Sequence, residues 1–371
     1  MINILFLINT LGGGGAEKAL INLVNYIDPS RFRITVETMF DDGVNVPRLH
    51  PDIRYISKKA PCPRGIAYVF RLFSAKQLYR YFIGNEKYDI LVAYMHGAPV
   101  KVISGCPDPK VRKIAWLHNG NPETGTFFKF WMTKKAAFRA YENCAAVVGV
   151  SRSVSEAFAR YTGIEDVKTV YNTCDVDLIR SLAEQDPPFR KDNDKKYLVS
   201  VGRISEEKGY DRFFEVCRRL YGEGYPLDVT VVGTGDKEDE LKKRIAETSV
   251  GDWFHLAGFQ ENPYPYVANA DLFVCPSYQE GLSTAVAEAV ILGVPVVSTD
   301  VSGAKEILGE HDEYGLVTQN SEEGLYEGVK KMLSDENLRA YYRQKSSERA
   351  GSFAPENTVK QAEELFRSVL V

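Results

Sequence analysis

The chain has 371 residues, of which 44% are hydrophobic and 26% charged, and this ordinary globular composition excludes a disordered or collagen-like chain. The length predicts two domains, and the apolar stretches are far shorter than the roughly 18–20 residues that a helix needs to cross a bilayer. The formal net charge of −4 is unevenly placed: residues 1–180 carry 24 Lys and Arg against 16 Asp and Glu, whereas residues 181–371 carry 22 against 34.

The N-terminal run MINILFLI has no basic residue before its apolar part, so we expect a buried strand and not a signal peptide. The cysteines show neither a Cys-x-x-Cys pair nor the spacing of a zinc site. This pattern predicts free thiols in a reducing compartment. The six positions are Cys62, Cys106, Cys144, Cys174, Cys217 and Cys275.

The first half of the chain alternates short apolar runs with helical stretches, which is typical of a parallel sheet. Ile2–Ile8 is the first expected strand, and Ala16–Tyr26, after four glycines, has the apolar spacing of a helix. The other expected strands in this half are Arg33–Met39, Ile90–Met95, Lys113–His118 and Ala145–Val150.

A polar stretch with a proline pair, 183–196, is the expected linker between an N-terminal domain, 1–182, and a C-terminal domain, 197–352. We expect 353–371 to form a helix that packs back on the N-terminal domain. Two such units facing each other across a cleft would hold a ligand at the carboxyl ends of their strands. The strands expected in the second domain are Tyr197–Gly202, Leu227–Gly233, Trp253–Ala257, Leu272–Cys275 and Pro295–Thr299, and the helices are Asp211–Tyr221, Lys237–Glu247 and Ser283–Leu292.

The glycine run Gly12–Gly15 follows the first strand and precedes the first helix. Glycines at this place let backbone N–H groups approach a phosphate, although a purely structural turn explains the run equally well. The run does not match Gly-x-Gly-x-x-Gly, but Glu37 lies about 20 residues on, where a dinucleotide enzyme has an acidic residue, so that class stays open.

Arg203 and Lys208 follow the first strand of the second domain and can converge on a diphosphate. The guanidinium is a two-pronged donor and the ammonium a point charge. A surface ion pair is the alternative for both. Gly233 follows the next strand in a Val-Gly-Thr-Gly turn, where a backbone can approach a ligand closely.

Glu280 and Glu288 enclose a predicted helix start between two buried strands. The N–H groups of Leu282, Ser283 and Thr284 would point toward an anion there. Helix rise separates the two carboxylates by about 12 Å, which does not fit the roughly 5 Å of a hydrolase that forms a covalent intermediate.

Together, four motifs resemble the retaining glycosyltransferases of family 4: Glu-x7-Glu, Gly-Arg-x4-Lys-Gly, the double glycine before Ala16-Glu17, and Trp116-Leu-His118-Asn. The resemblance covers nearly the whole chain. It implies an α/β protein with the GT-B fold, in which two Rossmann-like domains with parallel sheets face each other across a cleft. It also implies transfer of a sugar from a nucleotide-sugar, with UDP favoured over GDP, to a glycan acceptor. Together with the basic first half of the chain, the resemblance suggests a lipid-linked acceptor, such as a polyprenyl-diphosphate-linked glycan, in capsule or exopolysaccharide assembly.

The resemblance implies a role for each matching residue. The residues that would bind the donor diphosphate are Arg203, Lys208, Gly14 and Gly15. Those that would contact the donor sugar are Glu280 and the backbone of Gly281, Leu282, Ser283 and Thr284, with His118 beside the reacting centre. Glu288 would accept from the ribose hydroxyls, and the residues bordering the base would be Gly233, Gly258 and Phe259.

The resemblance implies a front-side path, in which a phosphate oxygen of the donor helps to remove the acceptor proton. Arg203, Lys208 and the helix start at Leu282 can stabilise the leaving diphosphate, so we expect no metal or other cofactor. The short Asp-x-Asp matches at Asp175–Asp177 and Asp192–Asp194 leave a metal site as the weaker alternative. The chain departs from the family where Thr173 follows Asn172 in place of a usual Gly, and where Ser283 stands for a common Gly.

Basic and aromatic residues alternate in two stretches, 53–85 and 127–139. Anionic lipid attracts such segments, so we expect a cytoplasmic protein on the inner face of the plasma membrane. The alternative is a pair of core-facing helices with solvated lysines. No nucleic-acid-binding motif is visible. The rival functions are a sugar-nucleotide epimerase of the same architecture and an NAD-dependent oxidoreductase.

Overall fold

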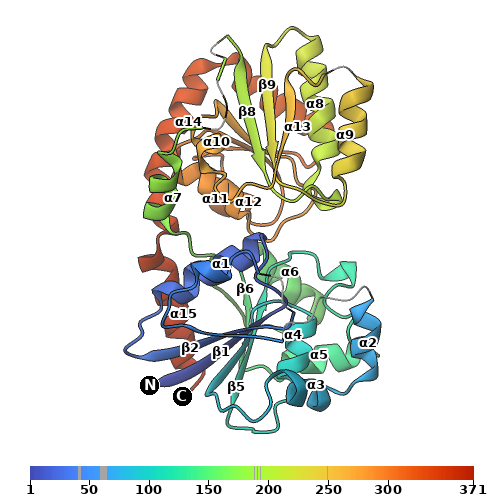
Figure 1. Cartoon of the computed structure of the whole chain (residues 1–371), viewed down its shortest axis with the longest axis vertical. Helices are drawn as coiled ribbons and strands as arrows, with labels where there is room; N and C mark the ends of the chain where they lie inside the picture. Colours follow the sequence, from blue (N-terminus) through green and yellow to red (C-terminus); the bar gives the residue numbers. More distant parts are fainter. Residues whose placement is uncertain (41–42, 59–64, 188, 190, 193, 249) are drawn as a thin grey trace. The chain divides into compact units, whose positions relative to one another are not determined.

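The computed structural model describes residues 1–371 except 41–42, 59–64, 188, 190, 193 and 249, and it divides into two α/β units (Figure 1). Unit 1 comprises Met1–Thr173 and Pro355–Val371, and unit 2 comprises Cys174–Ala354.

The described part of unit 1 contains a seven-stranded parallel sheet in the order β3-β2-β1-β4-β5-β6-β7. The chain starts in the middle, runs to one edge and returns to build the other half, so a topological switch point lies between β1 and β4. The strands are β1 (Ile2–Ile8), β2 (Phe32–Thr38), β3 (Arg54–Ser57), β4 (Ile90–Ala93), β5 (Arg112–Leu117), β6 (Ala146–Gly149) and β7 (Val167–Thr169).

Helices cover both faces of this sheet. Figure 1 shows α1 and α15 together on one side and α3, α4 and α5 on the other. The helices of unit 1 are α1 (Gly15–Tyr26), α2 (Ile66–Leu72), α3 (Ala75–Phe82), α4 (Ala98–Ile103), α5 (Lys134–Glu142), α6 (Arg152–Thr162) and α15 (Pro355–Ser368), with 3₁₀ turns at Val46–Arg48 and Pro122–Thr124.

The last helix, α15, belongs to unit 1 because its apolar face fills that unit's core. Phe366 is fully buried. Its ring centroid lies 5.9 Å from that of Phe6, 6.0 Å from that of Phe32 and 6.5 Å from that of Trp116. Residues 355–371 therefore complete a core that the first 173 residues leave open on this side.

Unit 2 contains, within its described residues, a six-stranded parallel sheet in the order β10-β9-β8-β11-β12-β13. Numbered within the unit, this is the order 3-2-1-4-5-6 of dinucleotide-binding folds, with the switch point between β8 and β11. The strands are β8 (Lys196–Val201), β9 (Leu227–Val232), β10 (Phe254–Gly258), β11 (Leu272–Cys275), β12 (Val296–Thr299) and β13 (Leu316–Thr318).

The helices of unit 2 also flank their sheet, with α8 and α9 on one side and α10, α11 and α14 on the other (Figure 1). They are α7 (Val176–Ala183), α8 (Tyr210–Gly222), α9 (Glu238–Glu247), α10 (Tyr264–Ala268), α11 (Thr284–Ile291), α12 (Ala304–Leu308), α13 (Glu322–Ser334) and α14 (Glu336–Arg349), with 3₁₀ turns at Glu206–Lys208 and Ala350–Phe353.

The division between the units falls after Thr173, so the expected boundary at 182 and the expected linker 183–196 are corrected. Phe189 packs its ring against Tyr197 and Tyr266, with centroids 4.6 and 5.4 Å apart, and Lys191 lies 3.1 Å from the carboxylate of Asp271. The polar composition of 183–196 predicted a linker because it gave no indication of these contacts with unit 2.

Every strand expected from the sequence is present, with ends shifted by a residue or two. The missed strands, β3, β7 and β13, are all sheet edges. Edge strands are short and half exposed, so they lack the continuous apolar run that reveals a central parallel strand.

The five described cysteines are free thiols, and Cys62 lies outside the described residues. Across the described helices, none combines the length and the apolar character that a bilayer crossing requires.

Candidate functional site

The centre of the candidate site lies at the switch point of unit 2, where the loops after β8 and β11 meet. Gly209 ends the 3₁₀ turn Glu206–Lys208 with φ +66°, and a Cβ there would lie 2.1 Å from the carbonyl oxygen of Pro276. Only glycine tolerates both this backbone conformation and this approach. The close approach brings Lys208 beside the loop that carries Glu280.

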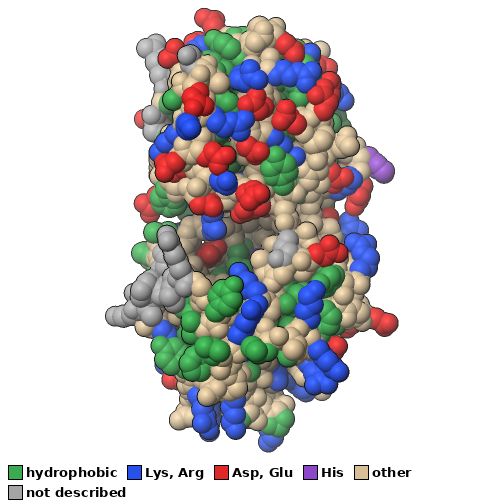
Figure 2. All heavy atoms as spheres, turned by 90° about the vertical axis from the view of Figure 1, so that its right-hand side faces the viewer, with side chains coloured by type: hydrophobic (Ala, Val, Ile, Leu, Met, Phe, Trp, Pro, Cys, Tyr) green, Lys and Arg blue, Asp and Glu red, His purple; other side chains and the backbone are tan. Residues whose placement is uncertain are grey.

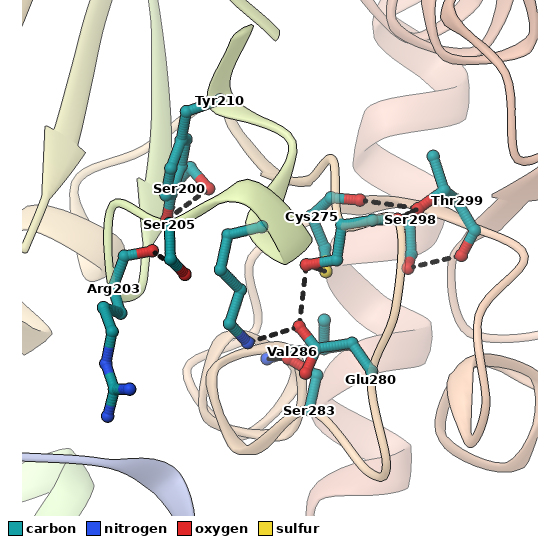
Figure 3. A network of polar contacts seen from close by, with 12 residues as sticks. Ser200, Arg203, Ser205, Tyr210, Cys275, Glu280, Ser283, Val286, Ser298 and Thr299 are labelled. Carbon is teal, nitrogen blue, oxygen red and sulfur yellow. Dashed lines mark hydrogen bonds and ion pairs between the residues drawn. The ribbon is translucent and has the colours of Figure 1, made fainter. Parts of the chain in front are cut away.

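Lys208 and Glu280 form an ion pair with 2.7 Å between Nζ and Oε1, and the Ser277 hydroxyl donates to the same oxygen, also at 2.7 Å (Figure 3). The Glu280 side chain is 9% exposed and that of Lys208 25%. Burial opposes the charge on Lys208, but the adjacent carboxylate outweighs it, so the pKa of Lys208 is raised. Lys208 is therefore charged at neutral pH, and its side chain is partly open to solvent.

A buried arginine that sequence reasoning missed holds the Glu280 loop from behind. Arg212 donates from Nε to the Pro276 carbonyl at 2.6 Å and from Nη2 to the Ser277 carbonyl at 2.5 Å. Its guanidinium also lies 3.9 Å from the ring centroid of Tyr278. Lys208 lies in the 3₁₀ turn that Gly209 ends, whereas Arg212 lies in the first turn of α8, so no helical spacing in the sequence connects them.

Glu288 does not share a helix with Glu280, so the expected separation along a helix is corrected. The helix α11 begins at Thr284, and Ser283 is its N-cap, accepting from the Val286 N–H. Glu288 is 6% exposed and accepts a hydrogen bond of 3.2 Å from the Tyr264 hydroxyl, a partner that the sequence did not indicate.

The expected backbone contacts of Gly281, Leu282, Ser283 and Thr284 lie at the entrance of α11. Gly281, Leu282 and Ser283 are buried, and Thr284 is partly exposed. Because the Ser283 hydroxyl satisfies an N–H of the first turn, part of the donor capacity of this helix end is already used. The serine that replaces the family's glycine therefore has a local capping role.

Arg203 is exposed, and Figure 3 shows its side chain extending away from Glu280. The structure thus brings Lys208, but not Arg203, into the carboxylate network. An exposed arginine on a loop can reorient toward a ligand at low cost, because no packing holds it.

The residues expected to border the base gather at the ends of β9 and β10. Gly233 has φ +142°, and a Cβ there would lie 2.0 Å from the Gly202 carbonyl oxygen, so glycine is required for the close passage of two loops. Its N–H donates to the Gly258 carbonyl at 2.8 Å. Phe259, the next residue, is 52% exposed and presents a ring to solvent.

Unit 1 holds His118 just after β5, at the carboxyl edge of the sheet, with its ring 4.7 Å from that of Tyr94. Burial, and then the neighbouring His96, lower the pKa of His118 to about 3, and burial followed by Lys129 lowers the pKa of His96 to about 4. Both imidazoles are therefore neutral at physiological pH.

Four buried polar atoms at this edge, two of them on the imidazoles, have no hydrogen-bond partner within the described residues. They are Asn9 Oδ1, His96 Nδ1, His118 Nε2 and Asn172 Oδ1. They follow β1, β4, β5 and β7, whose carboxyl ends meet at one edge of the sheet. A buried polar atom is normally satisfied, so this edge is suited to a polar ligand.

Gly14 and Gly15 lie at the start of α1. Gly14 is the N-cap and Gly15 the first helical residue, and no side chain caps the first turn. A glycine N-cap leaves room for an anion to approach the start of α1.

Thr173, which stands where the family usually has glycine, is buried and contributes to unit 1. Its hydroxyl accepts from Thr358 of α15 at 2.9 Å, and its carbonyl accepts from the Asn22 side chain at 3.0 Å. The substitution therefore adds a link between the end of unit 1's main segment and its last helix.

The acidic residues that made a dinucleotide or metal site an alternative have other surroundings in the structure. Glu37 lies within β2 and is 2% exposed, so its carboxylate does not face solvent as a ribose ligand would require. Asp175 caps α7, and the Asp192 carboxylate accepts from the Asp194 N–H. Among side chains in the described ranges, no group of three or more His, Cys, Asp and Glu is arranged to hold a metal ion.

The two basic–aromatic stretches differ in the exposure of their aromatic rings. In 127–139 the rings of Phe127, Phe128, Phe130 and Trp131 are all buried, since they fill the space between α4, α5 and α6. In 53–85 a run of large apolar side chains on and after α2 is exposed, and residues 59–64, with Lys59 and Arg64, lie outside the described residues.

Two family models match the chain along most of its length. The model described as Glycosyltransferase Family 4 matches residues 13–178, and the model described as Glycosyl transferases group 1 matches residues 181–349.

Curated relatives carry names from glycan assembly. The N-acetylgalactosamine-N,N'-diacetylbacillosaminyl-diphospho-undecaprenol 4-alpha-N-acetylgalactosaminyltransferase of Campylobacter jejuni is 28% identical over 362 residues, covering 93% of this chain and 94% of the relative. The amylovoran biosynthesis glycosyltransferase AmsK of Erwinia amylovora is 38% identical over 126 residues, or 32% of this chain and 31% of the relative.

Solved structures match over the full length. HepE of Anabaena, in complex with UDP and glucose, has a TM-score of 0.78 at 21% identity and covers 99% of this chain and 100% of its own. Sucrose-phosphate synthase of Thermosynechococcus elongatus has a TM-score of 0.80 at 16% identity, covering 100% and 99%. The predicted fold class, two Rossmann-like α/β domains of the GT-B type, is confirmed.

Proposed function

Because the chain belongs to glycosyltransferase family 4, we propose that it moves a sugar from a UDP-sugar to a lipid-linked glycan with retention of the anomeric configuration. The observation that carries the proposal is the Lys208–Glu280 pair at the switch point of unit 2. A nucleotide-sugar offers a partner to each member, because its diphosphate complements the ammonium and its sugar hydroxyls complement the carboxylate.

Donor binding would exchange the partners of Lys208 and Glu280. Lys208 would turn from Glu280 to the diphosphate, and Arg203, exposed on the same loop, would add a two-pronged donor. Glu280 would then accept hydroxyls of the donor sugar while Ser277 keeps its hydrogen bond to the carboxylate. Glu288 would accept the ribose hydroxyls beside the Tyr264 hydroxyl.

The leaving diphosphate gains negative charge as the glycosidic bond breaks. Lys208, Arg203 and the N-terminus of α11 would supply positive charge there, so the proposed reaction would need neither a metal ion nor another cofactor. This stabilisation grows in the transition state, because the charge on the bridging oxygen develops only as the bond breaks.

Retention follows if the acceptor hydroxyl attacks the face from which the diphosphate leaves and a phosphate oxygen takes its proton. His118 would act as a neutral hydrogen-bonding group to the donor sugar, because its low pKa keeps the imidazole uncharged. The other unsatisfied polar atoms at the carboxyl edge of unit 1, on Asn9, His96 and Asn172, are the groups that the acceptor glycan would engage.

The choice of donor base and acceptor is supported by the relatives. HepE is seen with UDP, and the name of the Campylobacter enzyme specifies a diphospho-undecaprenol acceptor. A lipid-linked acceptor would place the reaction at a membrane surface, so we propose a cytoplasmic protein that works peripherally on the inner face of the plasma membrane, in capsule or exopolysaccharide assembly.

The proposal is tested by incubating the purified chain with UDP-, GDP- and ADP-sugars, with and without a polyprenyl-diphosphate-linked saccharide. We expect UDP release that depends on the acceptor and persists with a metal chelator, and a product whose anomeric proton coupling matches that of the donor. Sugar isomerisation without acceptor would indicate an epimerase, and an absorbance change with NAD would indicate an oxidoreductase. Either result would overturn the proposal.

A further inference from the structure

Unit 1 carries an exposed apolar surface that its own fold does not cover. The side chains of Tyr68, Val69 and Leu72 on α2 and of Phe73 just after it are 72, 44, 81 and 44% exposed, and Met132 on the adjoining segment is 75% exposed. We call these five side chains the α2 face. Single exposed apolar residues are common, but a contiguous group of large ones marks an interaction site.

The α2 face is the outer side of an amphipathic helix. Within α2 only Phe70 is buried, and it faces inward against Phe82 and Phe130, with ring centroids 6.0 and 5.9 Å away. Residues 68, 69, 72 and 73 lie on the opposite stripe, as the helical period requires. The surface is therefore a consequence of the helix's orientation and not of a frayed segment.

A buried lysine fixes this helix in place. Lys101 of α4 is 5% exposed, and its Nζ donates to the carbonyl of Phe70 at 2.6 Å and to that of Phe130 at 2.9 Å. Arg71 adds a hydrogen bond of 2.7 Å to the Lys129 carbonyl. A short helix with one buried residue is thus held rigidly, with its apolar side turned to solvent.

Basic side chains accompany the α2 face, and no acid interrupts them. Residues 65–85 and 125–141 contain no Asp or Glu. Figure 2 shows hydrophobic side chains lying beside Lys and Arg on this unit. The exposed cations of the two segments are Lys76, Arg80, Lys129, Lys134, Lys135 and Arg139.

We propose that the α2 face inserts into the headgroup region of an anionic lipid membrane, with these cations pairing with lipid phosphates. Apolar side chains surrounded by cations complement a surface that is apolar inside and negative outside. The buried rings of 127–139 take no part, so that stretch contributes only Met132, its lysines and Arg139. The inference deepens the proposed function by naming the surface that would meet a lipid-linked acceptor.

The test is sedimentation of the full chain with vesicles of phosphatidylcholine, and with vesicles of equal parts phosphatidylcholine and phosphatidylglycerol. We expect binding to the anionic vesicles that weakens as salt is added. The double variant Leu72→Ser/Phe73→Ser should lower the partition coefficient about tenfold or more, because two large side chains no longer enter the lipid. Lys76→Glu/Arg80→Glu should lower it similarly.

Matched controls are Tyr341→Ser, which removes an exposed aromatic from α14, and Lys243→Glu, which reverses an exposed charge on α9. Both should bind as the original chain does, and all variants should keep its melting temperature. Equal binding by all variants, or no binding to anionic vesicles, would overturn the proposal. So would a concentration-dependent dimer that Leu72→Ser dissociates, because the α2 face would then be covered by a second copy.

Vesicle binding needs neither donor nor acceptor, so its failure is separable from failure of the proposed function. A chain that transfers sugar to a detergent-solubilised acceptor but ignores anionic vesicles would refute only the membrane surface. A chain that binds the vesicles but releases no UDP would refute only the reaction.

Discussion

Replacing Arg212 tests how firmly the fold positions Glu280. Arg212 is 2% exposed and donates to two consecutive carbonyls of the loop that leads to Glu280. Ser277, whose carbonyl it holds, donates its hydroxyl to the Glu280 carboxylate. Arg212 does not contact Glu280 itself, so we assign it a positioning role, and its loss should move the carboxylate.

The cost of Arg212→Leu follows from these contacts. A hydrogen bond to a charged group contributes about 1.5–3 kcal/mol, and the Pro276 carbonyl would lose such a donor, whereas the Ser277 carbonyl keeps the Thr299 hydroxyl at 2.6 Å. Part of the loss is recovered, because burial already lowers the pKa of Arg212 and the charge itself is costly to bury. The free energy of unfolding should therefore fall by about 1–3 kcal/mol.

The effect on turnover should be larger than the effect on stability. A displacement of about 1 Å at a reacting group costs on the order of 10²-fold in rate. We therefore expect kcat to fall about 10²-fold in Arg212→Leu with a smaller change in the donor KM, since Lys208 and Arg203 remain. Arg212→Lys should restore part of kcat, because an ammonium can reach one carbonyl but cannot bridge both.

The assay is steady-state transfer with the donor varied, beside circular dichroism and a denaturant titration. Arg219→Leu is the matched control, because it removes an arginine from the same helix whose ion pair with Glu323 is solvent-exposed. Combining Arg212→Leu with Ser277→Ala should give less than the sum of the single losses if both act through Glu280. A destabilised Arg212→Leu protein with kcat within twofold of the original would refute the positioning role.

Three further predictions concern the site and the core. Lys208→Ala and Glu288→Ala should each lower kcat/KM by about 10²-fold or more with an unchanged circular dichroism spectrum, and near-normal transfer by both would refute the site assignment. Phe366→Ala should lower the free energy of unfolding of unit 1 by about 3–5 kcal/mol, measured by denaturant titration, and a change below about 1 kcal/mol would show that α15 is not part of that core. Burial raises the pKa of Glu37 to about 7, so the folded state holds its proton more tightly and stability should fall as pH rises from about 4.5 to 7. Glu37→Gln should not lose this stability, so the difference in the free energy of unfolding between the variant and the original chain should change by about 3 kcal/mol over this range, in favour of the variant. Melting temperatures measured against pH check this, and parallel pH profiles for the two proteins would refute the assignment.

The sequence revealed the central strands because they are buried on both faces. The run Tyr197–Gly202 is nearly continuous in apolar residues, and it became β8 with its middle residues fully enclosed. The edge strand Arg54–Ser57 has no fully buried residue, so composition gave no sign of it. Edge strands form because a neighbour offers a ladder of hydrogen bonds, and that neighbour is not visible in a local pattern.

Some residues of the candidate site could be predicted from the sequence and others could not. Lys208 and Glu280 were found from motif spacing, and the structure brings them to 2.7 Å although 72 residues separate them. The sequence did not indicate the role of Arg212, because an arginine on a helix is normally expected at the surface. Its role depends on carbonyls of a loop more than 60 residues away, which only the folded chain brings within reach.

The two basic–aromatic stretches show the limit of pattern reading most clearly. Both alternate basic and aromatic residues, yet the rings of 127–131 lie in the core and those at 68 and 73 are exposed. The spacing of apolar residues shows that a segment has an apolar side, but it does not show which other element packs against that side. Such elements are distant in sequence, as α4 is, whose buried Lys101 holds α2 by a hydrogen bond to the Phe70 carbonyl. The sequence by itself thus determined the parallel α/β architecture and the charged residues of the site. Tertiary packing alone decided which apolar faces were buried, which residue supports Glu280, and where the chain divides.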